Sequence, residues 1–475
     1  MIYPLNPNIP LCLRPTQVQQ TRLHSLWINL IPFPRVRDNL IRHEGTYDHW
    51  ELLQDLIGSL INFTPSQEQR RTLYSFTVTD PKPKGPLLTT GCDEDEVTAG
   101  RNGLIVWGEP YEMHSWEATP AFLEKWATLS HLPLLIALST NTDMSRYAEV
   151  HTKPNGPGDG RPTALQIVKD EGMEGSLKGE VIVITGTSSG IGIETTRALA
   201  VTGATLFLTA RDVTKAQNAL AGIFEPSRME IVEMDQANLS SVRAAAAAIL
   251  SKTSKIHLLV NNAGIMAIPD LRLTSDGHEL QFGTNHLSHF LFYKMLEPAL
   301  LAAASADLPS RVVSLASSAH NVHGLNSPDN YAFEKSVYDP SVAYGQSKTA
   351  NIYMANEIER RYGAHNLHAV SVHPGIVATG LTQHMPPDAF KGMEHLYPLM
   401  KSVEQGAATS VWAAIGAAWK YKGGRYLVDC AAAEPYAEGE DKFTTSGYAP
   451  WAYDKDLAER LWNDSLFLVG LQKGE

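Results

Sequence analysis

Tyr344 and Lys348 have the types and the spacing to carry out acid-base chemistry. They stand four positions apart in YGQSK, which places both side chains on one face of a helix. A tyrosine in water has a pKa of about 10 and is a slow proton donor or acceptor at neutral pH, whereas a neighbouring ammonium favours the phenolate and lowers the pKa. The pair therefore predicts a tyrosine tuned for proton transfer. The spacing alone is common in helices, so further residues must support it.

Residues 181–192 read VIVITGTSSGIG, and two interpretations lead to different chemistries. A strand that enters a turn with Gly186, Gly190 and Gly192 and then a helix directs backbone N–H groups at one point, where a pyrophosphate binds. The same stretch contains GTSSG, which matches the G-x-S-x-G turn of a nucleophilic serine in α/β-hydrolases. That interpretation also needs an oxyanion-hole loop upstream, and no HGGG-type loop precedes Val181.

The next expected strand indicates the cofactor. A dinucleotide site binds the adenosine ribose at the end of the second strand, about twenty residues after the glycines. Ala210 occupies the position where an NAD enzyme would carry an acid, and Arg211 follows it. Arginine binds a 2′-phosphate through charge-assisted, bidentate hydrogen bonds, so the sequence predicts NADP. The alternative role for Arg211 is that of a solvated charge at a strand end.

The elements that must position these residues alternate from residue 180 onward. Short β-branched runs and amphipathic segments follow one another, which predicts βαβ units and a Rossmann-type, doubly wound parallel sheet. Upstream, HTKPNGPGDGRPT (151–163) contains glycines and prolines that exclude helix and strand. We place the domain boundary there and expect a flexible linker.

Composition excludes several classes of protein. The formal charge of -12 and the lack of a basic run argue against nucleic-acid binding. Cys12, Cys92 and Cys430 are too few and too scattered for a disulfide framework or a Cys-x-x-Cys metal site. Prolines interrupt the first fifteen residues where a signal peptide needs an apolar core, and the apolar runs are too short for a membrane span. We expect a cytoplasmic protein.

Further motifs follow the glycine turn in order along the chain. They are Asp235 at the end of MEIVEMD, Asn261-Asn262-Ala263-Gly264, Asn285 in GTNHLSHF, Ser318 in RVVSLASSAH, the Tyr344 and Lys348 pair, and His373-Pro-Gly-Ile-Val377-Ala-Thr379. With Thr185-Gly186-x-x-x-Gly190-Ile191-Gly192 they resemble the motifs of the short-chain dehydrogenase/reductase family, and its retinol-dehydrogenase-like fungal branch in particular. The resemblance covers about residues 144–472 and decides in favour of the nucleotide cradle.

The resemblance implies a catalytic tetrad of Asn285, Ser318, Tyr344 and Lys348. Ser318 and Tyr344 would bind the substrate carbonyl while a hydride moves from C4 of NADPH to carbon and Tyr344 protonates the alkoxide. Lys348 would tune the tyrosine and hold the nicotinamide ribose, and Asn285 would anchor a water that refills the proton relay. Ser318 is preferred to Ser317 because the family pattern places the catalytic serine immediately before the small-residue turn, here Ala319-His320.

The resemblance also implies how cofactor and substrate bind. The cofactor-binding residues would be Gly186, Ser188, Ser189, Gly190, Ile191, Gly192, Arg211, Asp235, Asn262, Ala263, Gly264, Tyr344, Lys348, Val377 and Thr379, with NADP as cofactor and no metal. The 25 residues between Ser318 and Tyr344 exceed what compact members need. That length is similar to the retinol dehydrogenase branch and predicts a lipophilic or polycyclic carbonyl substrate, such as a secondary metabolite. Members of the family often form homo-oligomers.

The first part of the chain, residues 22–142, resembles an uncharacterised domain found C-terminal to basic leucine zippers in fungal proteins. We expect a smaller, mostly helical domain; no basic zipper precedes it, so no nucleic-acid partner is expected. Residues 144–177 would then form a linker and reductase arm, and residues 178–472 the reductase domain. Met144 followed by a small residue suggests that 144–475 is a complete enzyme. The alternative function is a non-catalytic, NADPH-binding regulatory protein, against which the intact tetrad argues.

Overall fold

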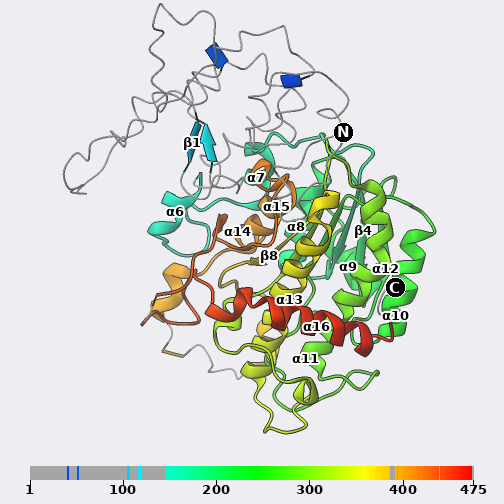
Figure 1. The fold of residues 1–475 in the computed structure, drawn as a ribbon, viewed down its shortest axis with the longest axis vertical. Coiled ribbons are helices and arrows are strands. Elements are labelled where there is room, and N and C mark those ends of the chain that lie inside the picture. The colour runs from blue at the N-terminus through cyan, green and yellow to red at the C-terminus, as the bar shows by residue number, and fades with distance from the viewer. Residues whose placement is uncertain are drawn as a thin grey trace, which may run out of the picture. The chain divides into compact units, whose positions relative to one another are not determined.

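The computed structural model divides the chain into two compact units, residues 1–143 and 144–475. It describes residues 40–41, 51–52, 146–385, 391–392, 394–437 and 439–472, and the backbone of 104–106 and 116–118. In the first unit β1 (Leu104–Val106) pairs with β2 (Trp116–Ala118) in antiparallel register (Figure 1). The mostly helical character predicted for 22–142 concerns residues that lie almost entirely outside the described ones. Cys12, Cys92 and Met144 also lie outside them.

The second unit is built on an eight-stranded sheet with the order β10-β9-β8-β7-β6-β3-β4-β5. The strands are β3 (Val181–Thr185), β4 (Thr205–Ala210), β5 (Met229–Glu233), β6 (Leu258–Asn261), β7 (Ser310–Leu315), β8 (Leu367–His373), β9 (Tyr426–Val428) and β10 (Ala431–Ala432). All neighbours pair in parallel except β9 and β10. Strand order reverses beside β3, and ligands of such sheets bind beyond the carboxyl ends of the strands at that point. The predicted Rossmann-type sheet is confirmed.

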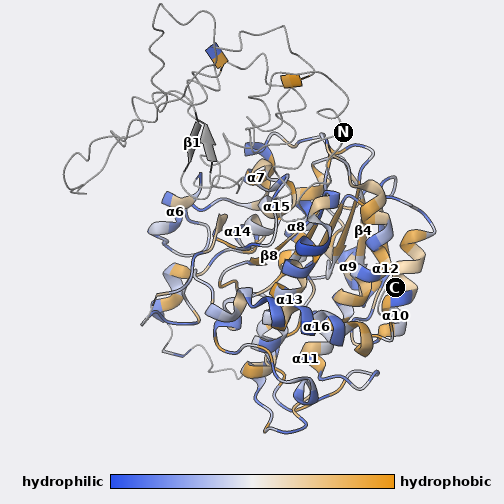
Figure 2. Ribbon diagram, in the orientation of Figure 1, coloured by the Kyte–Doolittle hydropathy of each residue, from blue (hydrophilic) through white to orange (hydrophobic). Residues whose placement is uncertain are grey.

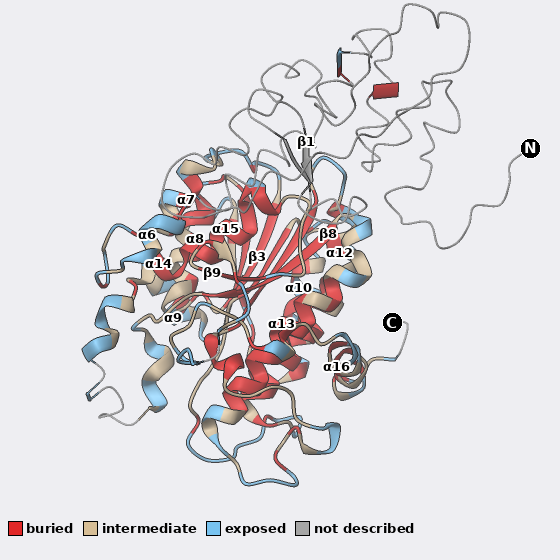
Figure 3. Ribbon diagram, turned by 60° about the vertical axis from the view of Figure 1, so that its left-hand side comes forward, coloured by how far each residue is buried: buried red, intermediate tan, exposed pale blue. Residues whose placement is uncertain are grey.

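Helices cover both faces of this sheet (Figures 1 and 3). They are α6 (Ala148–Thr152), α7 (Ala164–Asp170), α8 (Ile191–Ala200), α9 (Val213–Ala219), α10 (Leu239–Leu250), α11 (Leu280–Phe282), α12 (Ser288–Ala303), α13 (Pro340–Tyr362), α14 (Val403–Gly406), α15 (Ala408–Ile415) and α16 (Lys455–Leu468). A π-helical turn, η6 (Gly283–Leu287), joins α11 to α12. The 3₁₀ turns are η7 (Ser318–Asn321), η8 (Pro328–Asn330), η9 (Gly363–His365), η10 (Gly380–His384), η11 (Glu394–Leu399), η12 (Ala417–Trp419) and η13 (Pro450–Tyr453).

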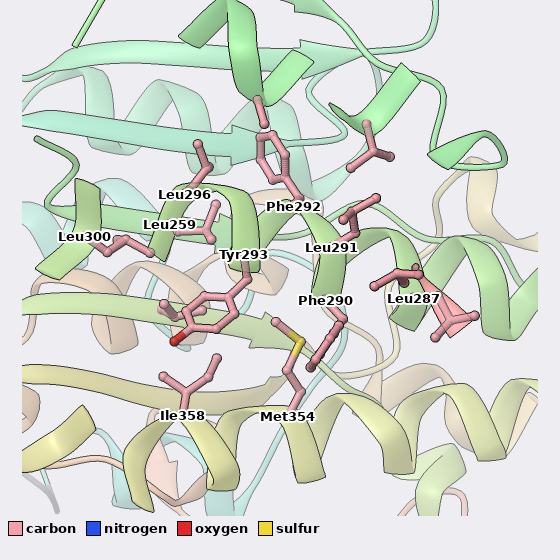
Figure 4. Close-up of a cluster of buried hydrophobic side chains, with 14 of the residues drawn as sticks. Leu259, Leu287, Phe290, Leu291, Phe292, Tyr293, Leu296, Leu300, Met354 and Ile358 are labelled. Atoms are coloured by element: carbon pink, nitrogen blue, oxygen red, sulfur yellow. The ribbon is translucent and has the colours of Figure 1, made fainter. Parts of the chain in front are cut away.

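Alternate residues of the strands build two apolar cores, one on each face. Val181 and Val183 pack with α10, α12, α13 and α16, whereas Ile182 and Ile184 pack with α7, α8 and α15. Figure 4 shows the first core, where Phe290 and Tyr293 of α12 face Met354 and Ile358 of α13. Burial on both faces explains why β3 is an unbroken β-branched run, and Figure 2 shows the same apolar strands by hydropathy.

The glycine- and proline-rich stretch 151–163 belongs to the second unit and is held in place. Residues 153–163 have no helix or strand, as predicted, but residues 151 and 152 belong to the end of α6. Arg161, however, is only 4% exposed, and its guanidinium donates to the carbonyls of Gly156 at 3.1 Å, Leu399 at 3.0 Å and Met400 at 2.5 Å. The structure therefore differs from the expected flexible linker, because a buried cation is bonded to carbonyls about 240 residues away in the sequence.

Candidate active site

The glycine turn after β3 is anchored to the neighbouring strand. The N–H groups of Gly186 and Thr187 donate to the Thr209 carbonyl at 2.9 and 3.1 Å. Gly186 has a φ of +72°, and a Cβ there would lie 2.7 Å from Cα of Ala263. A Cβ on Gly192 would lie 2.2 Å from the Gly186 oxygen. These contacts require glycine and leave the first turn of the ten-residue helix α8 open to an anion, so the cradle fits a dinucleotide.

Gly190 brings the turn into contact with the loop that follows β8. Its φ is +58°, and a Cβ on it would lie 3.3 Å from Cβ of Thr379. In the same loop Val377 pairs with Lys401 in an isolated bridge. The predicted loop residues therefore lie over the predicted phosphate turn. The remaining predicted residues of the turn differ in exposure: Ser188 and Ile191 are half-buried, and Ser189 is exposed.

Arg211 lies directly after β4, and Asp235 lies two residues after the end of the neighbouring strand β5, at the same edge of the sheet. Arg211 is exposed and makes no ion pair or side-chain hydrogen bond with the residues that the structure describes. It stands two positions from Thr209, whose carbonyl anchors the turn. Asp235 is half-buried, and its Oδ1 accepts from the Ala237 N–H at 3.0 Å. A cation available beside the turn fits a 2′-phosphate.

The end of β6 supports the glycine turn from its other side. Thr185 Oγ1 accepts from the N–H groups of Asn262 at 2.9 Å and Ala263 at 3.0 Å. The Asn262 amide donates to the carbonyls of Thr185 at 2.8 Å and Gly186 at 3.2 Å. Asn262 therefore braces the turn through its side chain. Sequence reasoning did not single out the Thr185 hydroxyl, which organises this junction.

Tyr344 and Lys348 both lie on α13, as their spacing predicts. The helix begins with Pro340 after the N-cap Asp339, whose side chain accepts from two backbone N–H groups. Tyr344 is 7% and Lys348 4% exposed. Lys348 Nζ donates to the Leu315 carbonyl at 3.0 Å and lies 5.4 Å from the centre of the Tyr344 ring. The ammonium is thus held between the tyrosine and the end of β7.

Burial controls the protonation of both groups. It raises the pKa of Tyr344 to about 12, against the opposing effect of a hydrogen bond with Ser317. It lowers the pKa of Lys348 to about 8. The sequence argument predicted a lowered tyrosine pKa, but removal from water disfavours the phenolate and the ammonium alike. Tyr344 is therefore protonated at neutral pH, the form that can donate a proton.

The serine beside Tyr344 is Ser317, and the choice of Ser318 is corrected. Ser317 is the hydrogen-bond partner of the Tyr344 side chain. Ser318 begins the 3₁₀ turn η7, and its hydroxyl donates to the Phe443 carbonyl at 2.8 Å. The two neighbours point to different partners because the extended backbone at Ser317, with φ -166° and ψ 157°, ends where the turn begins.

Asn285 lies in the π-helical turn η6 and is fully buried. Its Oδ1 accepts from the Ile265 N–H at 2.8 Å, and its amide donates to the Ile265 carbonyl and to Ser347 Oγ, both at 2.9 Å. Ser347 in turn donates to the Tyr344 carbonyl at 2.8 Å. Ser347 was not predicted from the sequence, although it stands three positions after Tyr344 on the same helix.

Gly264 marks the point where the predicted cofactor turn meets two of the predicted catalytic residues. A Cβ on it would lie 3.2 Å from Asn285 Oδ1 and 3.5 Å from Lys348 Nζ. The backbone after β6 thus passes directly against two catalytic candidates. No cluster of metal ligands occurs among the described residues. As far as the structure describes them, the helices are too short or too polar to span a bilayer.

Comparison with known proteins gives two family matches. A family model described as short chain dehydrogenase matches residues 180–389, and a domain of unknown function, DUF3425, matches residues 6–132. The second match confirms the uncharacterised domain predicted for 22–142 and begins earlier.

The chain is also similar to known proteins along most of their length. Short-chain dehydrogenase/reductase prx1 of Penicillium roqueforti is 45% identical over 331 residues, which is 69% of this chain and 96% of that protein. Oxidoreductase calI of Penicillium decumbens is 42% identical over 344 residues, covering 69% and 99% of the two chains. Mouse retinol dehydrogenase 12 is 35% identical over 300 residues, covering 62% and 88%.

Proposed function

The chain belongs to the short-chain dehydrogenase/reductase family, and we propose that it transfers a hydride between NADPH and a lipophilic carbonyl or alcohol substrate. The observation that carries the proposal is the convergence at Gly264, where Asn285 and Lys348 meet the backbone that supports the glycine turn. A protein that only binds a dinucleotide needs the turn but not a buried tyrosine and lysine beside it.

The side chains divide the work of reduction. Ser317 and Tyr344 would hold the substrate oxygen, and the Tyr344 hydroxyl would give its proton to the alkoxide oxygen. Bound NADPH would supply the hydride. Lys348 would stabilise the tyrosinate left behind and hold the nicotinamide ribose. Asn285 fixes the position of α13 through Ser347, so that the tyrosine keeps its place.

The preference for NADPH rests on Arg211. Its exposed guanidinium lies two residues from the carbonyl that anchors the glycine turn. Asp235, at the next strand end, keeps one carboxylate oxygen on the Ala237 N–H and leaves the other for the adenine amine. The 2′-phosphate would then meet a cation with a matching planar fork.

The apolar character of the substrate rests on the surroundings of the serine pair. Ser318 is bonded to the backbone of Phe443, whose side chain is 57% exposed. An exposed aromatic residue on the segment bonded to Ser318 offers an apolar surface to a ligand. The 25 residues before Tyr344 and the similarity to retinol dehydrogenase 12 support the same class of substrate.

One assay separates the enzyme from a non-catalytic NADPH-binding protein. Purified full-length protein is mixed with NADPH and a panel of apolar ketones and aldehydes, and NADPH oxidation is followed by absorbance. Turnover that is lost in Tyr344→Phe and kept in Tyr362→Phe, at the far end of the same helix, supports the proposal. Tight NADPH binding without turnover of any carbonyl compound would instead support the regulatory alternative, and turnover of small polar sugars alone would remove the apolar substrate.

A further inference from the structure

His289, on the first turn of α12, bonds to both halves of the site. It is 1% exposed and stands four positions after Asn285. Its Nδ1 lies 2.9 Å from the Asn285 carbonyl. Its Nε2 lies 2.9 Å from Thr185 Oγ1 and 2.9 Å from the Gln236 amide nitrogen. The ring therefore contacts Thr185 at the end of β3, Gln236 after β5, and the turn that carries Asn285.

The neighbours of the ring determine its tautomer. The Gln236 amide nitrogen also donates to the Thr284 carbonyl at 3.4 Å, and a carbonyl only accepts, so this nitrogen is the donor toward His289 Nε2. Thr185 Oγ1 already accepts two backbone N–H groups, which leaves its own proton for Nε2. With Nε2 as acceptor, Nδ1 carries the hydrogen and donates to the Asn285 carbonyl.

The electrostatic surroundings keep this ring neutral. Burial lowers the pKa of His289 to about 4, and the Lys348 ammonium acts in the same direction. The hydrogen bond to the Asn285 carbonyl opposes them without reversing the shift. A neutral ring that donates from Nδ1 and shares the lone pair of Nε2 between two donors fits these partners, so the ring stays neutral around pH 7.

We propose that His289 is a positioning residue that couples the cofactor turn to the catalytic asparagine, an inference that rests on the proposed function. Through Nε2 it fixes the Thr185 hydroxyl, which holds the backbone of Asn262 and Ala263 against the glycine turn. Through Nδ1 it fixes the carbonyl of Asn285, whose amide reaches Ser347 on the tyrosine helix. The π-helical turn Gly283–Leu287 places Asn285 at this junction, and such turns are frequent at functional sites.

The two ring nitrogens of His289 have different roles, and two substitutions distinguish these roles. His289→Asn keeps a donor near Nδ1 and removes the acceptor at Nε2, so the dissociation constant of NADPH should rise about tenfold while kcat at saturating NADPH changes less than about threefold. His289→Gln keeps a polar group near Nε2 and removes the donor to Asn285, so kcat should fall about tenfold with NADPH affinity nearly unchanged.

Binding is measured on the full-length protein by the fluorescence of bound NADPH, which needs no turnover. Thr185→Val should reproduce the binding defect of His289→Asn, and the two changes together should be less than additive. His286→Asn is the matched control, since its ring is also buried but bonds to Ser465 Oγ; it should alter neither property.

Three outcomes would overturn the proposal: equal losses of affinity and kcat in both His289 variants, wild-type behaviour of both, or the opposite assignment of the two effects. Near-ultraviolet circular dichroism establishes that each variant is folded before it is compared. If the wild-type protein reduces no carbonyl compound, the proposed function fails, and the NADPH affinities of the His289 and Thr185 variants still decide whether His289 supports the cofactor turn.

Discussion

Replacing Lys348 by methionine should make the larger unit more stable while it removes catalysis. Lys348 is 4% exposed, and burial lowers its pKa from the ordinary 10.5 to about 8. Each tenfold change in acidity corresponds to about 1.4 kcal/mol, so the buried ammonium destabilises the folded state by roughly 3 kcal/mol. Methionine has a similar length, is apolar and carries no such cost.

The pH dependence identifies the cause. The unfolded chain keeps the Lys348 proton up to about pH 10.5, whereas the folded chain loses it near pH 8. The unfolded state therefore binds more protons between these values, and stability rises with pH in this window. The cost is present in full below pH 8 and vanishes above pH 10.5, so the advantage of Lys348→Met should follow the same course.

The loss of a hydrogen bond reduces this gain only slightly. The Leu315 carbonyl that accepts from Lys348 also accepts from the Asn351 amide at 2.9 Å, so it keeps a partner. With about 1 kcal/mol for the lost bond, a net gain of roughly 2 kcal/mol remains. For a unit of about 330 residues this raises Tm by about 3 °C.

Differential scanning calorimetry of the full chain measures the effect on the transition of the larger unit. Lys348→Met should have the higher Tm at pH 7. Near pH 11, where only the lost hydrogen bond remains, its Tm should be about 1 to 2 °C below that of the wild type, with no NADPH oxidation at either pH. Lys455→Met, at an exposed position, should change neither. A lower Tm at pH 7, or a gain that persists near pH 11, would refute the assignment of the cost to the buried charge.

Four further predictions test the site and its support. Ser317→Ala should lower kcat about a hundredfold and Ser318→Ala only a few-fold in steady-state assays, and the reverse order would restore Ser318. Arg211→Asp should raise the dissociation constant of NADPH roughly a hundredfold and favour NADH; a wild type that prefers NADH would contradict it. The fragment 144–475 should be soluble and as active as the full chain, and an inactive fragment would contradict this. Arg161→Ala in the full chain should speed proteolysis near residues 394–400, and unchanged proteolysis would show that Arg161 does not hold this segment.

The sheet could be predicted because a strand that is buried on both faces has a recognisable sequence pattern. Every residue of Val181–Thr185 is buried, and a strand of this kind needs an unbroken run of β-branched residues. The strands at one edge of the sheet have no such pattern in the sequence. β10 contains two alanines, Ala431 and Ala432, and pairs antiparallel with β9 through tertiary contacts. Strands of two or three residues carry too few positions for a pattern.

Within the site, the residues fixed by the backbone were predictable and those fixed by distant partners were not. Gly186 and Gly192 are required because other backbone atoms approach them closely. A glycine-rich turn in the sequence indicates such close approaches. The direction of the Ser318 hydroxyl depends on Phe443, 125 positions away. His289 looks like an ordinary helix residue until Thr185 is brought beside it by the fold. Side-chain partners of this kind are a property of tertiary structure and have no local pattern.

The glycine- and proline-rich arm shows what composition does and does not determine. It correctly excludes regular structure after α6, but mobility depends on contacts. Gln405 donates to the Asp159 and Arg161 carbonyls at 3.1 and 3.0 Å, and Arg161 holds the carbonyls of 398–400. The next residue, Lys401, donates its N–H to the Ile376 carbonyl at 2.8 Å, in the loop that carries Val377 and Thr379, both predicted to bind the cofactor. The arm is thus linked to the loop after β8 through three consecutive carbonyls. We therefore expect an active fragment to need Arg161, although the family match begins only at residue 180.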